Sequence, residues 1–143
     1  GAAASVIENQ ANISVEFARE LIAEARSIAK ERGFKLSFAV SDADGYLVCS
    51  DTMTGAKRMT MRNAIDKSHT AALKRNVSAR EGATPAPKGI VSPDSPFVGR
   101  MVVMRGGVPI IVNGVVIGAI GASGTKAADD EAVVQAAIDA LLK

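Results

Sequence analysis

The fold of this chain is decided by Gly106-Gly107-Val108-Pro109-Ile110-Ile111-Val112, Asn113-Gly114 and Val115-Val116-Ile117-Gly118-Ala119-Ile120-Gly121, which follow one another without a break. Two runs rich in β-branched residues joined by Asn-Gly predict a β-hairpin, because a type I′ turn needs positive φ at both central residues. Both runs are apolar on both faces, so we expect other elements to cover the hairpin on both sides. Its glycines would let a second backbone, or a ligand, approach closely.

Further predicted elements lie on both sides of this hairpin. Ser14 is the expected N-cap of a first helix, and Gly33 is expected to end it. Leu36–Ser41 and Tyr46–Asp51 predict an earlier hairpin around an Asp-Gly turn. The remaining predictions are a helix over Thr60–Asn76, an irregular connection over 77–99, a short strand over Arg100–Met104 and a helix over Ala127–Leu142.

This order of elements predicts an α+β fold, in which an antiparallel sheet of about five strands carries helices on its faces. With 143 residues the chain is long enough for one domain with its own core. We expect residues 14–143 to form that domain and residues 1–13 to be a flexible N-terminal segment. No glycine motif of the dinucleotide-binding or P-loop type follows a predicted strand, so the sequence does not predict a nucleotide-binding site of either type.

Composition narrows the classes of function. An aromatic content of 3% and a net charge of only +2 argue against a nucleic-acid-binding surface. The sequence has no apolar run of about eighteen residues, so we expect no membrane partner. The cytoplasm is the expected location, and export with a removed leader stays open. Cys49 is the single cysteine, which excludes an intrachain disulfide, and we expect it to be a small buried side chain in a strand.

Several motifs are shared with a known family. They are Ala39-Val40-Ser41-Asp42 with Asp44-Gly45, Met53-Thr54-Gly55-Ala56, Lys67 with Thr70-Ala71, Gly106-Gly107-Val108-Pro109, and Val116 to Gly124 with Asp129 and Glu131 beyond. From about Ser14 onward the chain resembles the GlcG/HbpS-like heme-binding family, which also includes the C-terminal domain of PduO-type proteins. The resemblance implies a profilin-like sandwich that forms homo-oligomers. Some relatives bind heme, and some belong to operons for small-molecule catabolism.

His69 is the only histidine and the first candidate site residue. The resemblance makes heme the implied cofactor, and heme iron can take His69 as its single axial ligand. A zinc or copper site would need more ligands than the sequence offers beside it. Heme-binding relatives carry a histidine near the N-terminus or on a neighbouring strand, where this chain has none. The alternative is a histidine that merely packs in its helix.

The other candidate residues would bind an anionic small molecule between the second helix and the glycine-rich hairpin. Lys67 would hold a ligand carboxylate or a heme propionate, and Thr70 would orient it. Backbone N–H groups would assist at Gly106, Gly107, Ser123 and Gly124. The alternatives are a salt-bridged helix lysine and glycines that only form turns at strand ends.

The leading hypothesis is therefore a small-molecule or heme-binding protein that acts as a homo-oligomer. The alternative is a small catabolic enzyme, an isomerase, tautomerase or hydrolase, which acts on an unsaturated organic acid by proton transfer. His69 or Asp129 would then be the base and Lys67 the anchor, although Asp129 and Asp130 are most simply charges at a helix start. A third possibility is a protein whose apolar surface serves assembly alone. Whether the chain is an enzyme stays open at this point.

Overall fold

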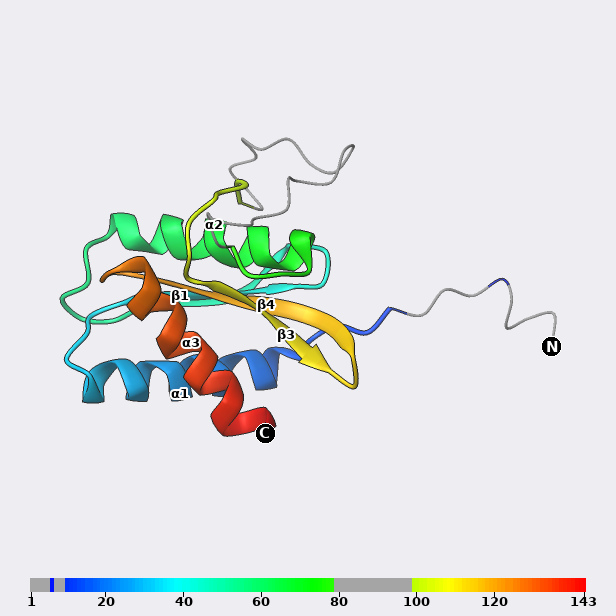
Figure 1. The fold of residues 1–143 in the computed structure, drawn as a ribbon, viewed down its shortest axis with the longest axis horizontal. Helices are drawn as coiled ribbons and strands as arrows, with labels where there is room; N and C mark the ends of the chain where they lie inside the picture. Colours follow the sequence, from blue (N-terminus) through cyan, green and yellow to red (C-terminus); the bar gives the residue numbers. More distant parts are fainter. Residues whose placement is uncertain (1–5, 7–9, 79–98) are drawn as a thin grey trace.

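Three helices and four strands make up the part of the chain that the structure describes, which is residue 6, residues 10–78 and residues 99–143. In this computed structural model the order is α1 (Val15–Glu31), β1 (Ser37–Asp42), β2 (Leu47–Thr52), α2 (Met59–Lys74), β3 (Gly107–Val112), β4 (Val115–Ser123) and α3 (Ala127–Leu142). The strands form an antiparallel sheet in the order β2-β1-β4-β3. One face carries α2 and the other carries α1 and α3 (Figure 1). The expected α+β sandwich is confirmed, with four strands in the described sheet where about five were expected.

The hairpin that decided the fold is formed by β3 and β4. Asn113 has φ 52° and Gly114 has φ 77°, the positive values that a type I′ turn requires. β4 also pairs with β1, so that the two hairpins join into one sheet. Helices cover the inner part of the β3–β4 hairpin on both faces, but Ile111 and Val115 at its tip are about half exposed.

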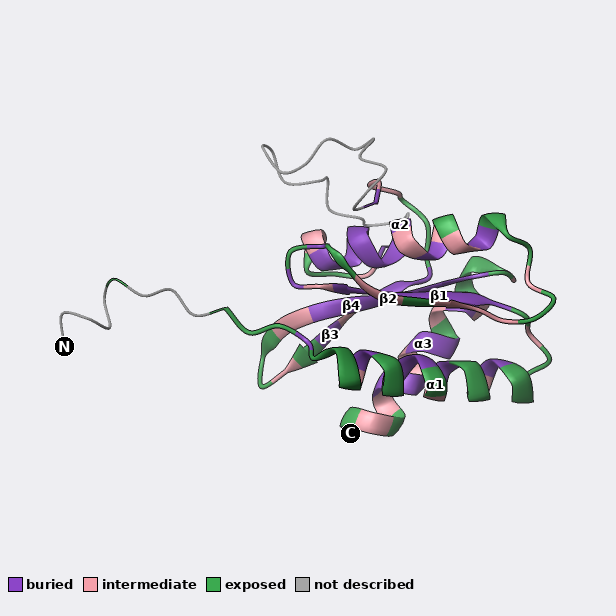
Figure 2. Ribbon diagram, turned by 180° about the vertical axis from the view of Figure 1, so that it is seen from behind, coloured by how far each residue is buried: buried purple, intermediate pink, exposed green. Residues whose placement is uncertain are grey.

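The main core lies between the sheet and the two helices α1 and α3, and Figure 2 shows buried residues on the sheet and on the inner sides of the helices. Ser14 caps α1, because its side chain accepts a hydrogen bond from the N–H of Phe17 at 3.1 Å. Ile13 is buried as well, and its N–H donates to the carbonyl of Ile117 at 3.0 Å. Residues 1–5 and 7–9 lie outside the described residues, so the expected flexible segment over 1–13 stays a prediction.

The short strand expected over Arg100–Met104 is not formed, and the described chain there is irregular. Its backbone is held by side chains of α2 instead of a neighbouring strand. The Arg100 N–H donates to Asp66 Oδ1, and the Val102 N–H donates to Thr70 Oγ1, both at 2.9 Å. Because these N–H groups already have partners, the segment does not need a place in the sheet.

Two further expectations concern Cys49 and the membrane. Cys49 is partly buried in β2 and packs against the main core, and burial raises the pKa of its thiol. It is thus a packing residue, as expected, although it is not fully enclosed. Among the described helices, none combines the length and the apolar character needed to span a bilayer.

Candidate functional site

Asp66–Thr70, five consecutive residues of α2, are all buried, although every one of them is polar or charged. A helix that lies on a sheet normally buries one side and exposes the other. Here Lys67 contacts β4, while His69 faces the turn between β1 and β2. Asp66 and Thr70 face the Arg100–Val102 segment. We call these five residues the α2 polar cluster, and they include three of the residues that the sequence singled out.

The His69 ring has one nitrogen bound and one free. Its Nδ1 lies 2.8 Å from the carbonyl oxygen of Gly45. Because a carbonyl oxygen can only accept, Nδ1 carries the proton and donates, which leaves the lone pair of the neutral ring on Nε2. Nε2 is buried and has no hydrogen-bond partner among the described residues. The sequence identified this histidine, but not which of its nitrogens would be available.

Two glycines enclose the imidazole. A Cβ atom added at Gly45 would lie 2.8 Å from Nδ1 of His69, and one added at Gly99 would lie 2.7 Å from Cβ of His69. Both glycines have positive φ, 85° and 122°, which other residues rarely adopt. The backbone therefore covers the ring closely on two sides and fixes its orientation.

Lys67 reaches the glycine-rich hairpin, but its nearest anion belongs to the chain itself. Its Nζ donates to the carbonyl of Ala122 at 3.0 Å and to Asp130 Oδ2 at 3.3 Å. Asp130 lies in the first turn of α3, as its position in the sequence suggested, and it is only 1% exposed. Burial raises the pKa of Asp130, and this is opposed by the Thr125 N–H, 3.0 Å from Oδ1, and by Lys67.

The glycines of the hairpin let α2 pack directly on the sheet. A Cβ atom at Gly107 would lie 2.2 Å from the carbonyl oxygen of Lys67, and one at Gly121 would lie 2.4 Å from that of Ala64. The Gly107 N–H is also taken, because it donates to Ser78 Oγ at 2.8 Å. At these positions the helix, not a ligand, fills the space against the hairpin.

The other predicted anion-binding positions also lie close to the chain's own groups. A Cβ atom at Gly106 would lie 2.8 Å from Nζ of Lys67, and one at Gly124 would lie 2.5 Å from the carbonyl oxygen of Lys35. Ser123 is buried at the end of β4, opposite Ser37 of β1. A role of these residues toward a ligand stays a prediction.

Thr70 fastens the segment that covers His69. Its Oγ1 accepts the Val102 N–H and donates to the carbonyl of Asp66 at 2.8 Å. Asp66 in turn pairs with Arg100, whose Nη2 lies 3.3 Å from Oδ2. Sequence reasoning missed Asp66 and Arg100 as partners, because they are 34 residues apart and no local pattern links them.

Asp129 lies in the first turn of α3, beside Asp130, whose carboxylate pairs with Lys67 of the α2 polar cluster. A role of Asp129 as a base stays a prediction. In the described ranges, no three His, Cys, Asp or Glu side chains come together in a way that would hold a metal ion. The structure thus places Lys67 with Asp130, and His69 with Gly45 and Gly99, as two separate arrangements on one helix.

A family model and a curated relative match almost the whole chain. The model described as "Haem degrading protein HbpS-like" matches residues 13–139. A 15.0 kDa protein in the dhaT-dhaS intergenic region of Citrobacter freundii is 27% identical over 136 residues, which cover 90% of this chain and 92% of that protein.

Solved structures agree with this match at the level of the fold. Klebsiella pneumoniae protein ORFY has a TM-score of 0.79 at 23% identity, covering 96% of this chain and 97% of its own. The structure of a PduOC–heme complex has a TM-score of 0.74, also at 23% identity, covering 92% of this chain and 96% of its own. At these identities the likeness shows a shared fold, and the heme in the second structure is a property of that protein.

Proposed function

The chain belongs to the HbpS-like family, and from this premise we propose that it binds heme, with Nε2 of His69 as the protein ligand to the iron. The observation that carries the proposal is the buried Nε2, which has no partner among the described residues. A buried polar atom without a partner costs about 1–3 kcal/mol, so a bound group that engages it recovers that energy. The heme complex formed by PduOC, which shares this fold, adds support.

The residues present suit heme better than a bare metal ion. Zinc and copper sites take three or more protein ligands, and the described residues offer no such group. A porphyrin brings four nitrogens of its own, so one imidazole completes a heme site. The Nδ1–H bond to Gly45 fixes the tautomer and makes Nε2 a better ligand. Bound there, heme would supply a redox-active iron.

Access to Nε2 requires part of its cover to move, because that atom is fully enclosed. Gly99 lies against the His69 side chain, and Asp66 and Thr70 hold the residues that follow it, Arg100 and Val102, on α2. Arg100 belongs to this segment, and its side chain is 41% exposed. Because Arg100 is exposed as well as paired with Asp66, we assign it to a heme propionate, whereas Lys67, with a side chain only 4% exposed, has a supporting role through its pair with Asp130.

A hemin titration with a rescue step tests this function. Wild-type protein should give a saturable shift of the Soret band, and His69→Ala should lose it. Because the alanine leaves a cavity, about 10 mM imidazole should restore the shift in that variant. Circular dichroism checks that the variant is folded. A Soret shift that survives His69→Ala, or one that imidazole does not restore in a folded variant, rejects the proposal.

The proton-transfer enzyme remains the second candidate, because a neutral imidazole with a free Nε2 can also act as a base. The described residues support it less. Its anchor, Lys67, already pairs with Asp130, which is the sequence neighbour of its alternative base, Asp129. The bond from Nε2 of His69 to heme iron involves neither side chain directly.

We also propose that the protein acts as a homo-oligomer. Apolar side chains are exposed beside the turn of the β3–β4 hairpin, at Ile111 and Val115, and in the segment before β3, at Val103 and Met104. A contact between copies of the chain would take such side chains out of water. Sedimentation should show one defined assembly, and a monomer at all concentrations would reject this. The cytoplasmic location stays a prediction.

A further inference from the structure

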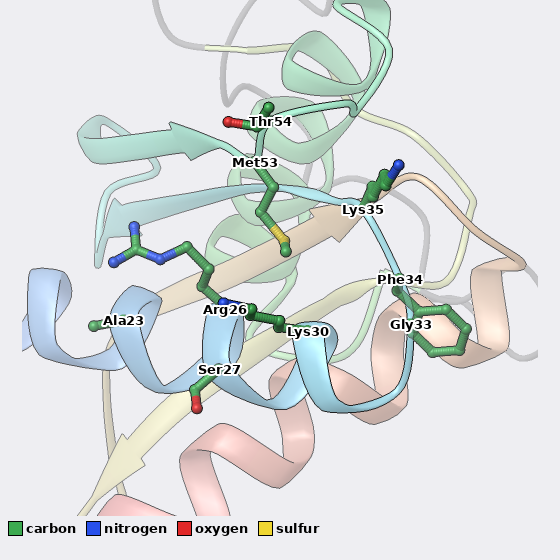
Figure 3. Close-up of a pocket in the computed structure, with 9 residues that line it drawn as sticks. All are labelled: Ala23, Arg26, Ser27, Lys30, Gly33, Phe34, Lys35, Met53 and Thr54. Atoms are coloured by element: carbon green, nitrogen blue, oxygen red, sulfur yellow. The ribbon is translucent and has the colours of Figure 1, made fainter.

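A hollow of about 610 Å³ lies on the other side of the sheet from His69, between the last turns of α1 and the segment that follows β2 (Figure 3). Its volume is in the range of small-molecule sites. Figure 3 shows Arg26 and Lys30 on the helix side and Met53 pointing from the opposite side toward α1. The hollow shares no lining residue with the α2 polar cluster, so a ligand bound in it would be independent of heme at His69.

The charges around this hollow are all positive. Arg26, Lys30 and Lys35 line it, and no carboxylate does. Arg26 pairs with Asp51, which lines a neighbouring hollow of about 500 Å³. Lys30 and Lys35 have no ion-pair partner among the residues that the structure describes. Both ammonium groups are thus without a carboxylate partner in that part of the chain, and Lys35, whose Nζ points outward in Figure 3, would turn inward to reach an anion in the hollow.

The walls also offer fixed apolar surface. Phe34 and Met53 are partly buried and pack against the main core, which holds them in place. The Met53 sulfur accepts the N–H of Leu36 at 3.4 Å. Lys35 lies flat over Gly55, because a Cβ atom there would come within 2.8 Å of its Cδ. Cations above an apolar floor suit a ligand that has a charged end and an apolar body.

We propose that this hollow binds a small organic anion, a phosphate or carboxylate attached to an apolar group. Lys30 and Lys35 bind the charged end, and Met53 and Phe34 contact the apolar body. Arg26 adds its positive charge while it remains paired with Asp51. Phosphate and carboxylate ligands of this kind both present negatively charged oxygens on an apolar group. The experiment below distinguishes between the two.

Chemical-shift mapping with phenyl phosphate tests this site. In ¹⁵N-labelled protein, saturable shifts should centre on residues 26–35 and 53–55. Inorganic phosphate and phenol each carry only one of the two parts of this ligand, so each should bind more weakly than phenyl phosphate. Titration with benzoate shows whether the site also accepts a carboxylate in place of the phosphate. Shifts that do not saturate, shifts centred elsewhere, or equal binding of inorganic and phenyl phosphate would overturn the proposal.

Paired variants separate this site from general attraction to a basic protein. Lys30→Gln with Lys35→Gln should weaken phenyl phosphate binding about tenfold, which corresponds to the loss of two exposed ion pairs. Arg75→Gln with Lys143→Gln removes the same charge from exposed positions outside the hollow and should leave the affinity within about twofold. Equal weakening by both pairs would overturn the proposal.

Discussion

At the scale of single residues, Lys67 and Asp130 form an ion pair that water does not reach, with side chains 4% and 1% exposed. Burying two charges is expensive, and their attraction offsets this only when further hydrogen bonds complete the pair. Ala122 accepts from Lys67, and Thr125 donates to Asp130. Because both ends are satisfied, removing one partner should cost more than removing both.

We predict that Lys67→Met lowers the free energy of unfolding by about 3–5 kcal/mol at pH 7, because it leaves the Asp130 carboxylate buried without its cation. Lys67→Met with Asp130→Asn removes both charges and should recover at least half of that loss. Urea denaturation measures both variants. A double variant as unstable as the sum of the single ones would show that the two residues do not act as a pair.

The cost of Lys67→Met should also depend on pH. The pKa of Asp130 is already raised by burial, and the loss of Lys67 raises it further. Above the ordinary pKa of an aspartate, near 3.9, the folded variant then holds a proton that the unfolded chain has lost. Its stability therefore falls as pH rises through the raised pKa. We expect a smaller defect at pH 5 than at pH 7, and an equal defect at both would contradict this.

The sequence could identify single candidate residues, but it could not identify contact partners that lie far away along the chain. His69 and Lys67 could be found because one is a lone histidine and the other belongs to a recognisable helix motif. Their partners are 24 and 63 residues away, at Gly45 and Asp130, and no periodicity connects such positions. The free Nε2 follows from the Gly45 contact, so it could not be predicted either.

At the scale of elements, α2 lies unusually close to the strands because glycines leave room for its backbone. We predict that Gly121→Ala costs about 3 kcal/mol of stability, since its Cβ would lie 2.4 Å from the Ala64 carbonyl oxygen. Gly114→Ala is the control, with φ 77° but nothing within 4 Å, and should cost about 1–2 kcal/mol of backbone strain. Thermal unfolding ranks the two. An equal or smaller cost at Gly121 would contradict direct packing.

The Gly99–Val102 segment is the second element with a functional consequence, because it covers His69. We predict that Thr70→Val lowers stability by about 1–3 kcal/mol, through loss of the acceptor for the Val102 N–H. It should also speed hemin association, since the cover opens more readily. Stopped-flow absorbance measures the rate. The control is Thr52→Val, which removes a hydrogen bond with Ser37 away from this segment and should leave the rate of hemin association unchanged. Equal rates in the wild-type protein, Thr70→Val and Thr52→Val would show that the Gly99–Val102 segment does not control access to His69.

Elements were predicted well where the signal is local. Asn113-Gly114 and the Ser14 cap each depend on two or three neighbouring residues, and both are confirmed. The strand expected at Arg100–Met104 was wrong, because side chains of α2 take its backbone N–H groups. α2 ends at Lys74 and not at Asn76, since Arg75 adopts the left-handed conformation with φ 55°.

At the scale of the whole molecule, the sheet separates two arrangements of different character. On the α2 face, most buried polar side chains have partners, and the exceptions on α2 are Nε2 of His69 and Nζ of Lys74. On the α1 face, an open hollow carries uncompensated positive charge. The overall sandwich could be predicted because the hydrophobic periodicity of each segment indicates which side packs against a neighbouring layer. The hollow could not be predicted, because it depends on how α1 lies beside β2.

The measurement that tests the central claim most directly is the imidazole ¹H–¹⁵N correlation spectrum of His69. The chain has one histidine, so the spectrum contains a single ring. We predict a proton on Nδ1 and a bare Nε2 in the free protein, and a saturable shift of the Nε2 resonance, with Nδ1 still protonated, when zinc protoporphyrin is added. A proton on Nε2, or an Nε2 resonance that saturating zinc protoporphyrin leaves in place, would contradict the account.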